Sequence, residues 1–222
     1  MIVLMGIVLF AALSYAVTKS MRGGGDFGNS EKSSIMASDI LTYSNSVANT
    51  VKALMATNGC TDTTISFENP TVSGYANSLS PTDKSCNVFD TAGGGLTWQL
   101  PNLAALDKTK SAGTNYDNWH VSRNTRVNGA GASDTAPGGN DLIMIAPYLT
   151  KDVCLSINKS LGYNGIQPSG GGVADTAKFT GVYQATSYAI ALPSQSLMFA
   201  GCGSFATGTY VGYVYYRVLI AR

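Results

Sequence analysis

The sequence predicts an α+β protein: a long apolar N-terminal helix, a Gly-rich break, and a second, amphipathic helix packed on an antiparallel β-sheet head with two disulfides. Three observations support this prediction. Residues 2–17 form an uncharged apolar run, apolar residues recur at helical spacing between residues 31 and 58, and the strand-like remainder contains four cysteines. Helical and strand periodicities in separate stretches of one chain are typical of α+β folds.

The apolar run IVLMGIVLFAALSYAV carries no charge, and Lys19 and Arg22 follow it. A helix of this length spans about 25 Å, close to the thickness of a hydrocarbon core. Three interpretations compete: a cleaved secretory signal, a permanent membrane anchor, or a segment that leaves the bilayer to pack against copies of itself. A secretory signal is disfavoured because its positive charges should precede the apolar core. The residues we expect in a filament core are Ile2, Val3, Leu4, Met5, Gly6, Ile7, Val8, Leu9, Phe10, Ala11, Ala12 and Leu13.

A break in the helix is expected directly after this run. Gly23, Gly24 and Gly25 stand together, and each glycine lowers helix stability by about 1 kcal/mol relative to Ala. The second helix is expected to begin near Asn29 or Ser30 and to end at 58. The predicted parts are therefore an apolar helix over 1–22, a flexible joint over 23–30, and a globular head over 31–222 that includes the amphipathic helix 31–58. One apolar stripe, formed by Ile40, Tyr43, Val47, Val51 and Leu54, should pack this helix on the head.

The composition of the chain excludes some classes of partner. Of its 222 residues only 12% are charged, and 14 Lys+Arg against 13 Asp+Glu leave a net charge of +1. A nucleic-acid binder would need a basic excess to neutralise phosphates, so we expect no nucleic-acid partner. No motif indicates a cofactor, and we expect none.

Cysteine usage indicates disulfides in an oxidising compartment. The four cysteines include no CxxC pair and the chain has a single histidine, which disfavours a zinc site. Four cysteines allow three pairings. We expect the sequence-local one, Cys60 with Cys86 and Cys154 with Cys202, although spacing does not determine it.

The head should combine short strands with one further helix. Strands are predicted at 63–67, 86–89, 96–100, 142–145, 187–192, 196–200 and 209–220, where β-branched and aromatic residues alternate between turn residues. A helix is predicted over 151–161, capped by Thr150 and ended by Gly162.

Few residues suit catalysis or metal binding. His120 has no Cys or paired carboxylate near it in sequence, so we interpret it as a surface or hydrogen-bonded histidine. Ser204 does not meet the GxSxG pattern of a hydrolase nucleophile. Asp134, Asn140 and Asp141 offer oxygen ligands for calcium, but a solvated loop is the favoured interpretation. We expect neither an enzyme nor a metal site.

The N-terminal quarter of the chain resembles the type IV pilins and pilin-like proteins. The resemblance rests on IVLMGIVLFAALSYAV, the GGG break, the helix SEKSSIMASDILTYSNSVANTVKALMATNGC and the two cysteine pairs. The segment DLIMIAPYLTKDVCLSINKSLG looks like the larger-headed type IVb branch. Most members carry a glutamate at the fifth mature position, where this chain has Met5, and no leader is present. If Met1 is the mature terminus, assembly must rest on apolar packing.

The resemblance implies a structural subunit of an extracellular filament, with heads outward and N-terminal helices bundled in the core. It also implies partners: copies of the chain, the inner membrane before assembly, a leader peptidase and the pilus assembly machinery. Two alternatives remain. One is a low-copy pseudopilin of a secretion or DNA-uptake machine, because some pseudopilins also lack the glutamate. The other is a membrane-tethered binding module that never assembles.

Overall fold

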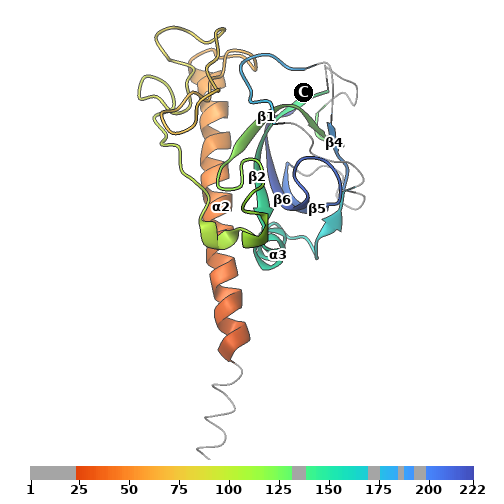
Figure 1. The fold of residues 1–222 in the computed structure, drawn as a ribbon. Helices are drawn as coiled ribbons and strands as arrows, with labels where there is room; N and C mark the ends of the chain where they lie inside the picture. Colours follow the sequence, from red (N-terminus) through yellow and green to blue (C-terminus); the bar gives the residue numbers. More distant parts are fainter. Residues whose placement is uncertain (1–23, 132–138, 170–175, 185–187, 193–198) are drawn as a thin grey trace, which may run out of the picture.

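The computed structural model describes residues 24–131, 139–169, 176–184, 188–192 and 199–222. In the described residues, two α-helices and two 3₁₀ turns accompany one sheet (Figure 1). The elements in chain order are α2 (Gly24–Thr57), η1 (Leu103–Ala105), η2 (Lys108–Lys110), β1 (His120–Val127), β2 (Asp141–Leu149), α3 (Lys151–Ser160), β3 (Gln167–Pro168), β4 (Tyr188–Ile190), β5 (Ala200–Phe205) and β6 (Gly212–Ile220).

The sheet is mixed, and the prediction of an antiparallel sheet is wrong. Its strand order is β3-β5-β6-β2-β1-β4, and the four central strands pair antiparallel. The outer strands run parallel to their neighbours, β4 to β1 and β3 to β5. Parallel neighbours need long crossover connections, and here β2 and α3 lie between β1 and β4 in the chain. Strand alternation in the sequence says which residues face a core but not which way each strand runs.

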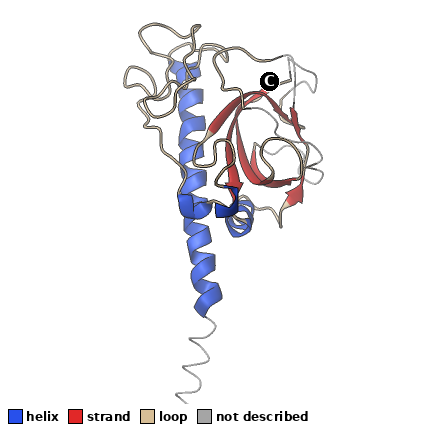
Figure 2. Ribbon diagram, in the orientation of Figure 1, coloured by secondary structure: helices blue, strands red, loops and turns tan. Residues whose placement is uncertain are grey.

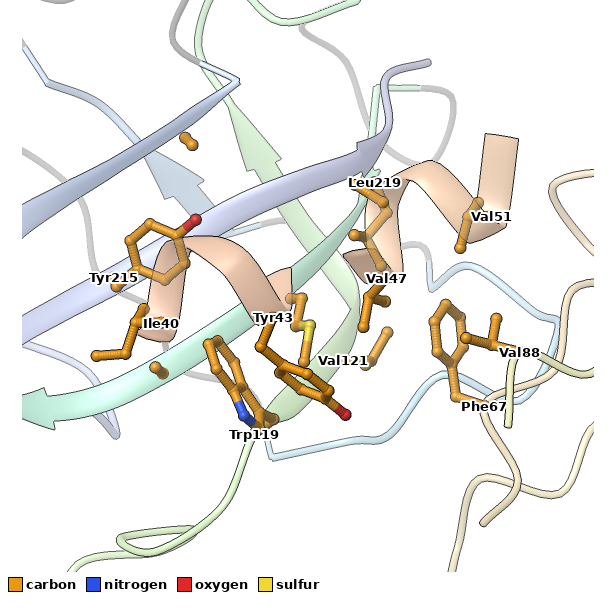
Figure 3. Close-up of a cluster of buried hydrophobic side chains, with 14 of the residues drawn as sticks. Ile40, Tyr43, Val47, Val51, Phe67, Val88, Trp119, Val121, Tyr215 and Leu219 are labelled. Carbon is orange, nitrogen blue, oxygen red and sulfur yellow. The ribbon is translucent and has the colours of Figure 1, made fainter. Parts of the chain in front are cut away.

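Helix α2 lies along one face of the curled sheet, and the lower part of α2 extends beyond the head (Figures 1 and 2). The predicted apolar stripe is confirmed, because all five of its side chains are buried. Figure 3 shows this face of α2 against Trp119 and Val121 from the β1 side and Tyr215 and Leu219 from β6. A buried hydrogen bond of 2.7 Å between Ser44 Oγ and the Tyr215 hydroxyl fixes α2 against β6.

The predicted break in the helix is wrong over 24–30. Helix α2 runs without interruption from Gly24, so Gly24 and Gly25 are helical residues. Extending an existing helix costs about 1 kcal/mol per glycine, whereas a new helix start requires a costly nucleus. The apolar N-terminal helix predicted over 1–22, and Gly23, lie outside the described residues.

No helix among the described residues is both long and apolar enough to cross a membrane. Helix α2 has the length, with 34 residues, but polar and charged residues surround its apolar stripe. The pilin-like fold class is therefore corrected: the described chain has two α-helices and a curled mixed sheet, braced by two disulfides.

Both predicted disulfide pairings are confirmed. Cys60–Cys86 closes the loop that follows α2, and Cys154–Cys202 joins α3 to β5. Sequence separations of 26 and 48 correspond to about 3.5 and 4 kcal/mol in the chain-entropy model. The buried Asn158 amide supports the second disulfide. Its Nδ2 donates to the Cys202 carbonyl and its Oδ1 accepts from the Cys202 N–H.

The sheet has a core on each face. The larger core lies between the sheet, α2, α3 and the loops over 60–119. The smaller core lies on the opposite face, where residues of β2 and β6 meet Phe205 and Tyr210. Two buried cores explain why β2 is buried along its whole length.

The strand predictions are correct for the long strands and wrong for the loop that follows α2. Residues 142–145 and 209–220 correspond to β2 and β6, and 151–161 corresponds to α3 with its Thr150 cap. By contrast, 63–67 and 86–89 share only the isolated bridge Ser66↔Asn87, and 96–100 forms no strand. Asn and Asp side chains in this loop accept hydrogen bonds from nearby backbone N–H groups and so replace a strand ladder. Strand β1 was not predicted, because HVSRNTRV lacks alternation and contains a register shift between Ser122 and Thr125.

A candidate docking groove beside the long helix

A groove lies between α2 and the loop over 95–102. It has a volume of about 620 Å³. Tyr43 and Trp119 both line it, and their ring centroids lie 5.5 Å apart; Figure 3 shows the two rings. Its other lining residues are Met36, Asp39, Ile40, Thr42, Ser46, Gly95, Leu96, Thr97, Gln99, Leu100, Pro101 and Asn102. We call this site the α2 groove.

Tyr43 positions the loop that forms the outer wall of the α2 groove. Its hydroxyl donates to the Thr97 carbonyl at 3.4 Å and accepts from the Gln99 N–H at 3.0 Å. Burial raises the pKa of Tyr43 to about 12, so the hydroxyl stays protonated and able to donate at any physiological pH. The wall is thus tied to α2 by a side chain of α2 itself.

The backbone at Gly94, just before the same loop, lies close against α2. A Cβ on Gly94 would overlap the Thr50 methyl group of α2 and the Val88 carbonyl. Next to it, Gly95 has φ +65°, which a side chain would strain. These two glycines therefore let the backbone approach α2 and turn at the start of the loop.

Three large apolar side chains are exposed in the groove lining or next to it in sequence, and of these only Leu100 lines the groove. Ile35, Leu100 and Leu103 are 62%, 51% and 57% exposed. Ile35 precedes the lining residue Met36, and Leu103 follows the lining residue Asn102. We call these three residues the apolar rim. Asp39 is the one charged residue of the lining.

The predicted site residues have different outcomes. Those of the apolar run, from Ile2 to Leu13, lie outside the described residues together with Gly23. Gly24 and Gly25 lie in α2, and the four cysteines form the two disulfides. The sequence did not indicate the α2 groove.

His120 is fully buried, so its interpretation as a surface or hydrogen-bonded residue is wrong. It begins β1, and its ring lies 5.9 Å from the Tyr210 ring. Neither ring nitrogen has a hydrogen-bond partner among the described residues. Burial, with a smaller contribution from the charge of Lys178, lowers its pKa to about 3. At neutral pH the ring is uncharged and closed off from solvent.

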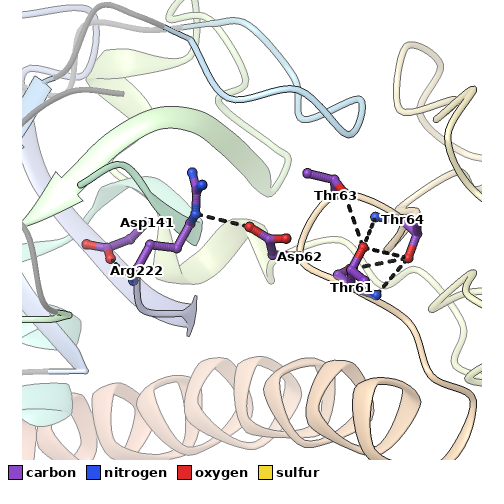
Figure 4. Close-up of polar contacts among 6 residues, drawn as sticks. All are labelled: Thr61, Asp62, Thr63, Thr64, Asp141 and Arg222. Carbon is purple, nitrogen blue, oxygen red and sulfur yellow. Dashed lines mark hydrogen bonds and ion pairs between the residues drawn. The ribbon is translucent and has the colours of Figure 1, made fainter. Parts of the chain in front are cut away.

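The carboxylate of Asp141, considered for calcium, binds backbone instead. It accepts from the Val127 N–H at 2.8 Å and from the Arg222 N–H at 3.0 Å. Arg222 in turn forms an ion pair with Asp62 at 3.0 Å, beside the hydrogen-bonded Thr61, Thr63 and Thr64 (Figure 4). This network joins the sheet end to the loop after α2.

Asn140 and Ser204, the other polar residues considered for a site, also make contacts within the fold. Asn140 Nδ2 donates to the Gln184 carbonyl, and Asp134 lies outside the described residues. Ser204 pairs with Tyr213 within the sheet. In the described part of the chain, no group of three or more His, Cys, Asp or Glu side chains could hold a metal ion.

Comparisons of the chain with known protein families, with curated proteins and with solved structures find no match.

Proposed function

We propose that this protein is a structural subunit of an extracellular filament of the type IV pilus kind. The observation that carries the proposal is the uncharged apolar run over 2–17. This run precedes α2 in the sequence, and α2 extends beyond the disulfide-braced head (Figure 1). Such a run needs an apolar environment, either lipid or other protein. Many copies that share their runs provide that environment outside the membrane.

In this proposal the subunit first waits in the inner membrane and is then moved to the cell surface. A leader peptidase and the pilus assembly machinery act as partners before and during that transfer. Small residues such as Gly6, Ala11 and Ala12 allow neighbouring runs to pack closely. In the filament, detachment exposes these runs to water at about 1.5 to 3 kcal/mol per large apolar side chain. Subunits should therefore not dissociate.

The head suits the exterior of such a filament. Two disulfides suit an oxidising compartment and stabilise a domain that has to persist outside the cell. A near-zero net charge of +1 lets heads pack side by side without strong mutual repulsion.

A substitution in the apolar run tests the proposal. Ala11→Phe should sharply reduce the amount of the chain in filaments sheared from the cell surface. The phenyl ring is much larger than the Ala11 methyl group and prevents close packing of neighbouring runs. The matched control is Ala76→Phe, at an exposed position of the head. If Ala11→Phe assembles as well as the control does, packing through the apolar run is wrong. Recovery of wild-type chain at low copy number would favour the pseudopilin alternative.

A further inference from the structure

We propose that Asn164 is a site of spontaneous deamidation, at which the folded head converts an asparagine side chain to aspartate or isoaspartate. The reaction needs only the head and is independent of filament formation. The chain contains three Asn-Gly pairs, at 58–59, 128–129 and 164–165. All three pairs are exposed, so exposure does not distinguish them. The hydrogen bonds around each pair do.

Deamidation of an Asn-Gly pair requires no reactant other than water. The backbone nitrogen of the glycine attacks the side-chain carbon Cγ of the asparagine. The C–N bond of the side-chain amide breaks, and ammonia leaves with the proton of the glycine N–H. Water then opens the resulting five-membered imide at either of its two carbonyls, which gives aspartate or isoaspartate. Glycine favours the reaction because it has no Cβ to hinder the attacking nitrogen.

The first pair is held by the fold. The Asn58 N–H donates to the Leu54 carbonyl at the end of α2 at 3.0 Å, and its Nδ2 donates to the Ser85 carbonyl at 2.8 Å. Ser85 precedes Cys86, whose disulfide with Cys60 fixes this carbonyl beside the end of α2. Both hydrogen bonds have to open before the Asn58 side chain can turn towards the backbone nitrogen of Gly59. This pair should therefore react slowly.

The second pair is held through its backbone. The Asn128 N–H donates to the Ile190 carbonyl of β4 at 3.0 Å. The Ala130 N–H donates to the Val127 carbonyl at 3.0 Å and closes a tight turn around the Asn-Gly pair. This pair is fixed at both ends, so it should react more slowly than an open one.

The third pair has neither restraint. Among the described residues, the Asn164 side chain and the N–H groups of Asn164 and Gly165 have no hydrogen-bond partner. The nearest anchor lies after the reacting bond, where the Gly165 carbonyl accepts from Asn158 Nδ2 at 2.8 Å. The side chain and the attacking nitrogen of this pair are therefore free to meet.

Conversion at Asn164 changes both the charge and the backbone of the head. One added carboxylate changes the formal net charge of +1 to zero. Isoaspartate also lengthens the backbone by a methylene group, directly before the Gly165 carbonyl that binds Asn158. Asn158 in turn holds Cys202, so the altered backbone adjoins the support of the second disulfide. A head that persists for a long time accumulates this change.

Mass spectrometry of the aged full chain tests the proposal. The purified protein is kept in mild detergent at mildly alkaline pH in ¹⁸O-labelled water, and a second sample is kept there after reduction and unfolding in urea. Water that opens the imide leaves an ¹⁸O atom in the product, so the label excludes conversion during later digestion in ordinary water. Fragmentation assigns the label to its residue. The matched control is Asn164→Gln, which keeps the carboxamide but would have to form a larger ring.

In the folded chain we expect Asn164 to convert at least about tenfold faster than Asn58, because two hydrogen bonds have to open at Asn58. In the unfolded chain these bonds are lost, and the three pairs should convert within about twofold of one another. The Asn164→Gln chain should gain no label at position 164. Conversion of Asn58 or Asn128 as fast as that of Asn164 in the folded chain would overturn the proposal. So would an Asn164 that gains label only in the unfolded chain.

Discussion

Replacement of the single histidine should flatten the pH dependence of stability. His120 has an ordinary pKa of about 6.5 in the unfolded chain and of about 3 in the folded protein. Between these values the unfolded state binds more protons, so stability falls as pH falls from 6.5 towards 3. Each pKa unit corresponds to 1.36 kcal/mol, so the full loss is about 5 kcal/mol, of which about 3 kcal/mol is reached by pH 4.5.

The variant His120→Phe keeps an aromatic ring against Tyr210 and removes the titrating group. Urea unfolding of the full chain in mild detergent at pH 7.5 and 4.5 provides the assay. We expect the wild type to lose about 3 kcal/mol more than the variant between the two pH values. Burial of the ring is the cause, because it disfavours the charged imidazolium.

Other titrating groups do not affect this comparison. Backbone hydrogen bonds lower the pKa values of Asp83 and Asp90, so their contributions are present at high pH and decline in acid. The wild type and the variant both carry Asp83 and Asp90. The contributions of these two groups therefore cancel when the stability losses of the two proteins are subtracted. Because the chain has one histidine, its ring resonances can also be followed directly. Equal losses in both proteins, or a His120 ring that titrates near pH 6.5, would refute the reasoning.

Three further substitutions test the packing of the head by urea or thermal unfolding. Combined Cys154→Ser and Cys202→Ser should cost about 4 kcal/mol, and a loss below 1 kcal/mol would contradict the loop-closure argument. Asn158→Ala should cost about 3 kcal/mol, because the Cys202 N–H and C=O both lose their side-chain partner. An unchanged unfolding midpoint would show that other groups replace these hydrogen bonds. Gly94→Ala should cost about 2 kcal/mol through overlap with the Thr50 methyl group, and Thr50→Ser should recover part of this loss if that overlap is the cause.

Local chemistry made several elements predictable from the sequence. The Thr150 side chain accepts from the Val153 N–H at the start of α3, and Gly162, with φ +83°, follows its last turn. Both capping features involve residues close together in sequence, so the bounds of α3 could be inferred without knowledge of the fold. The buried stripe of α2 was predictable for a similar reason, because helical spacing alone places its side chains on one face.

Long-range contacts account for what the sequence did not reveal. The surroundings of His120 depend on Tyr210, which lies far along the chain and is brought beside His120 by the fold. The α2 groove exists because Tyr43 of α2 binds the loop at Thr97 and Gln99. The stretch 96–100 looked like a strand, since its aromatic and apolar residues resemble a half-buried sheet surface. In the structure Trp98 is buried in the larger core, Thr97 and Gln99 bind the Tyr43 hydroxyl of α2, and Leu100 stays exposed.

The central claim, that this chain is the subunit of a surface filament, is tested most directly on material sheared from the native cell surface. Electron microscopy of that material, with mass spectrometry of the same fraction, shows whether fibres are present and which protein forms them. The account predicts ordered thin fibres composed mainly of this chain. Absence of the chain from the sheared fraction, together with its recovery in membranes, would contradict the claim.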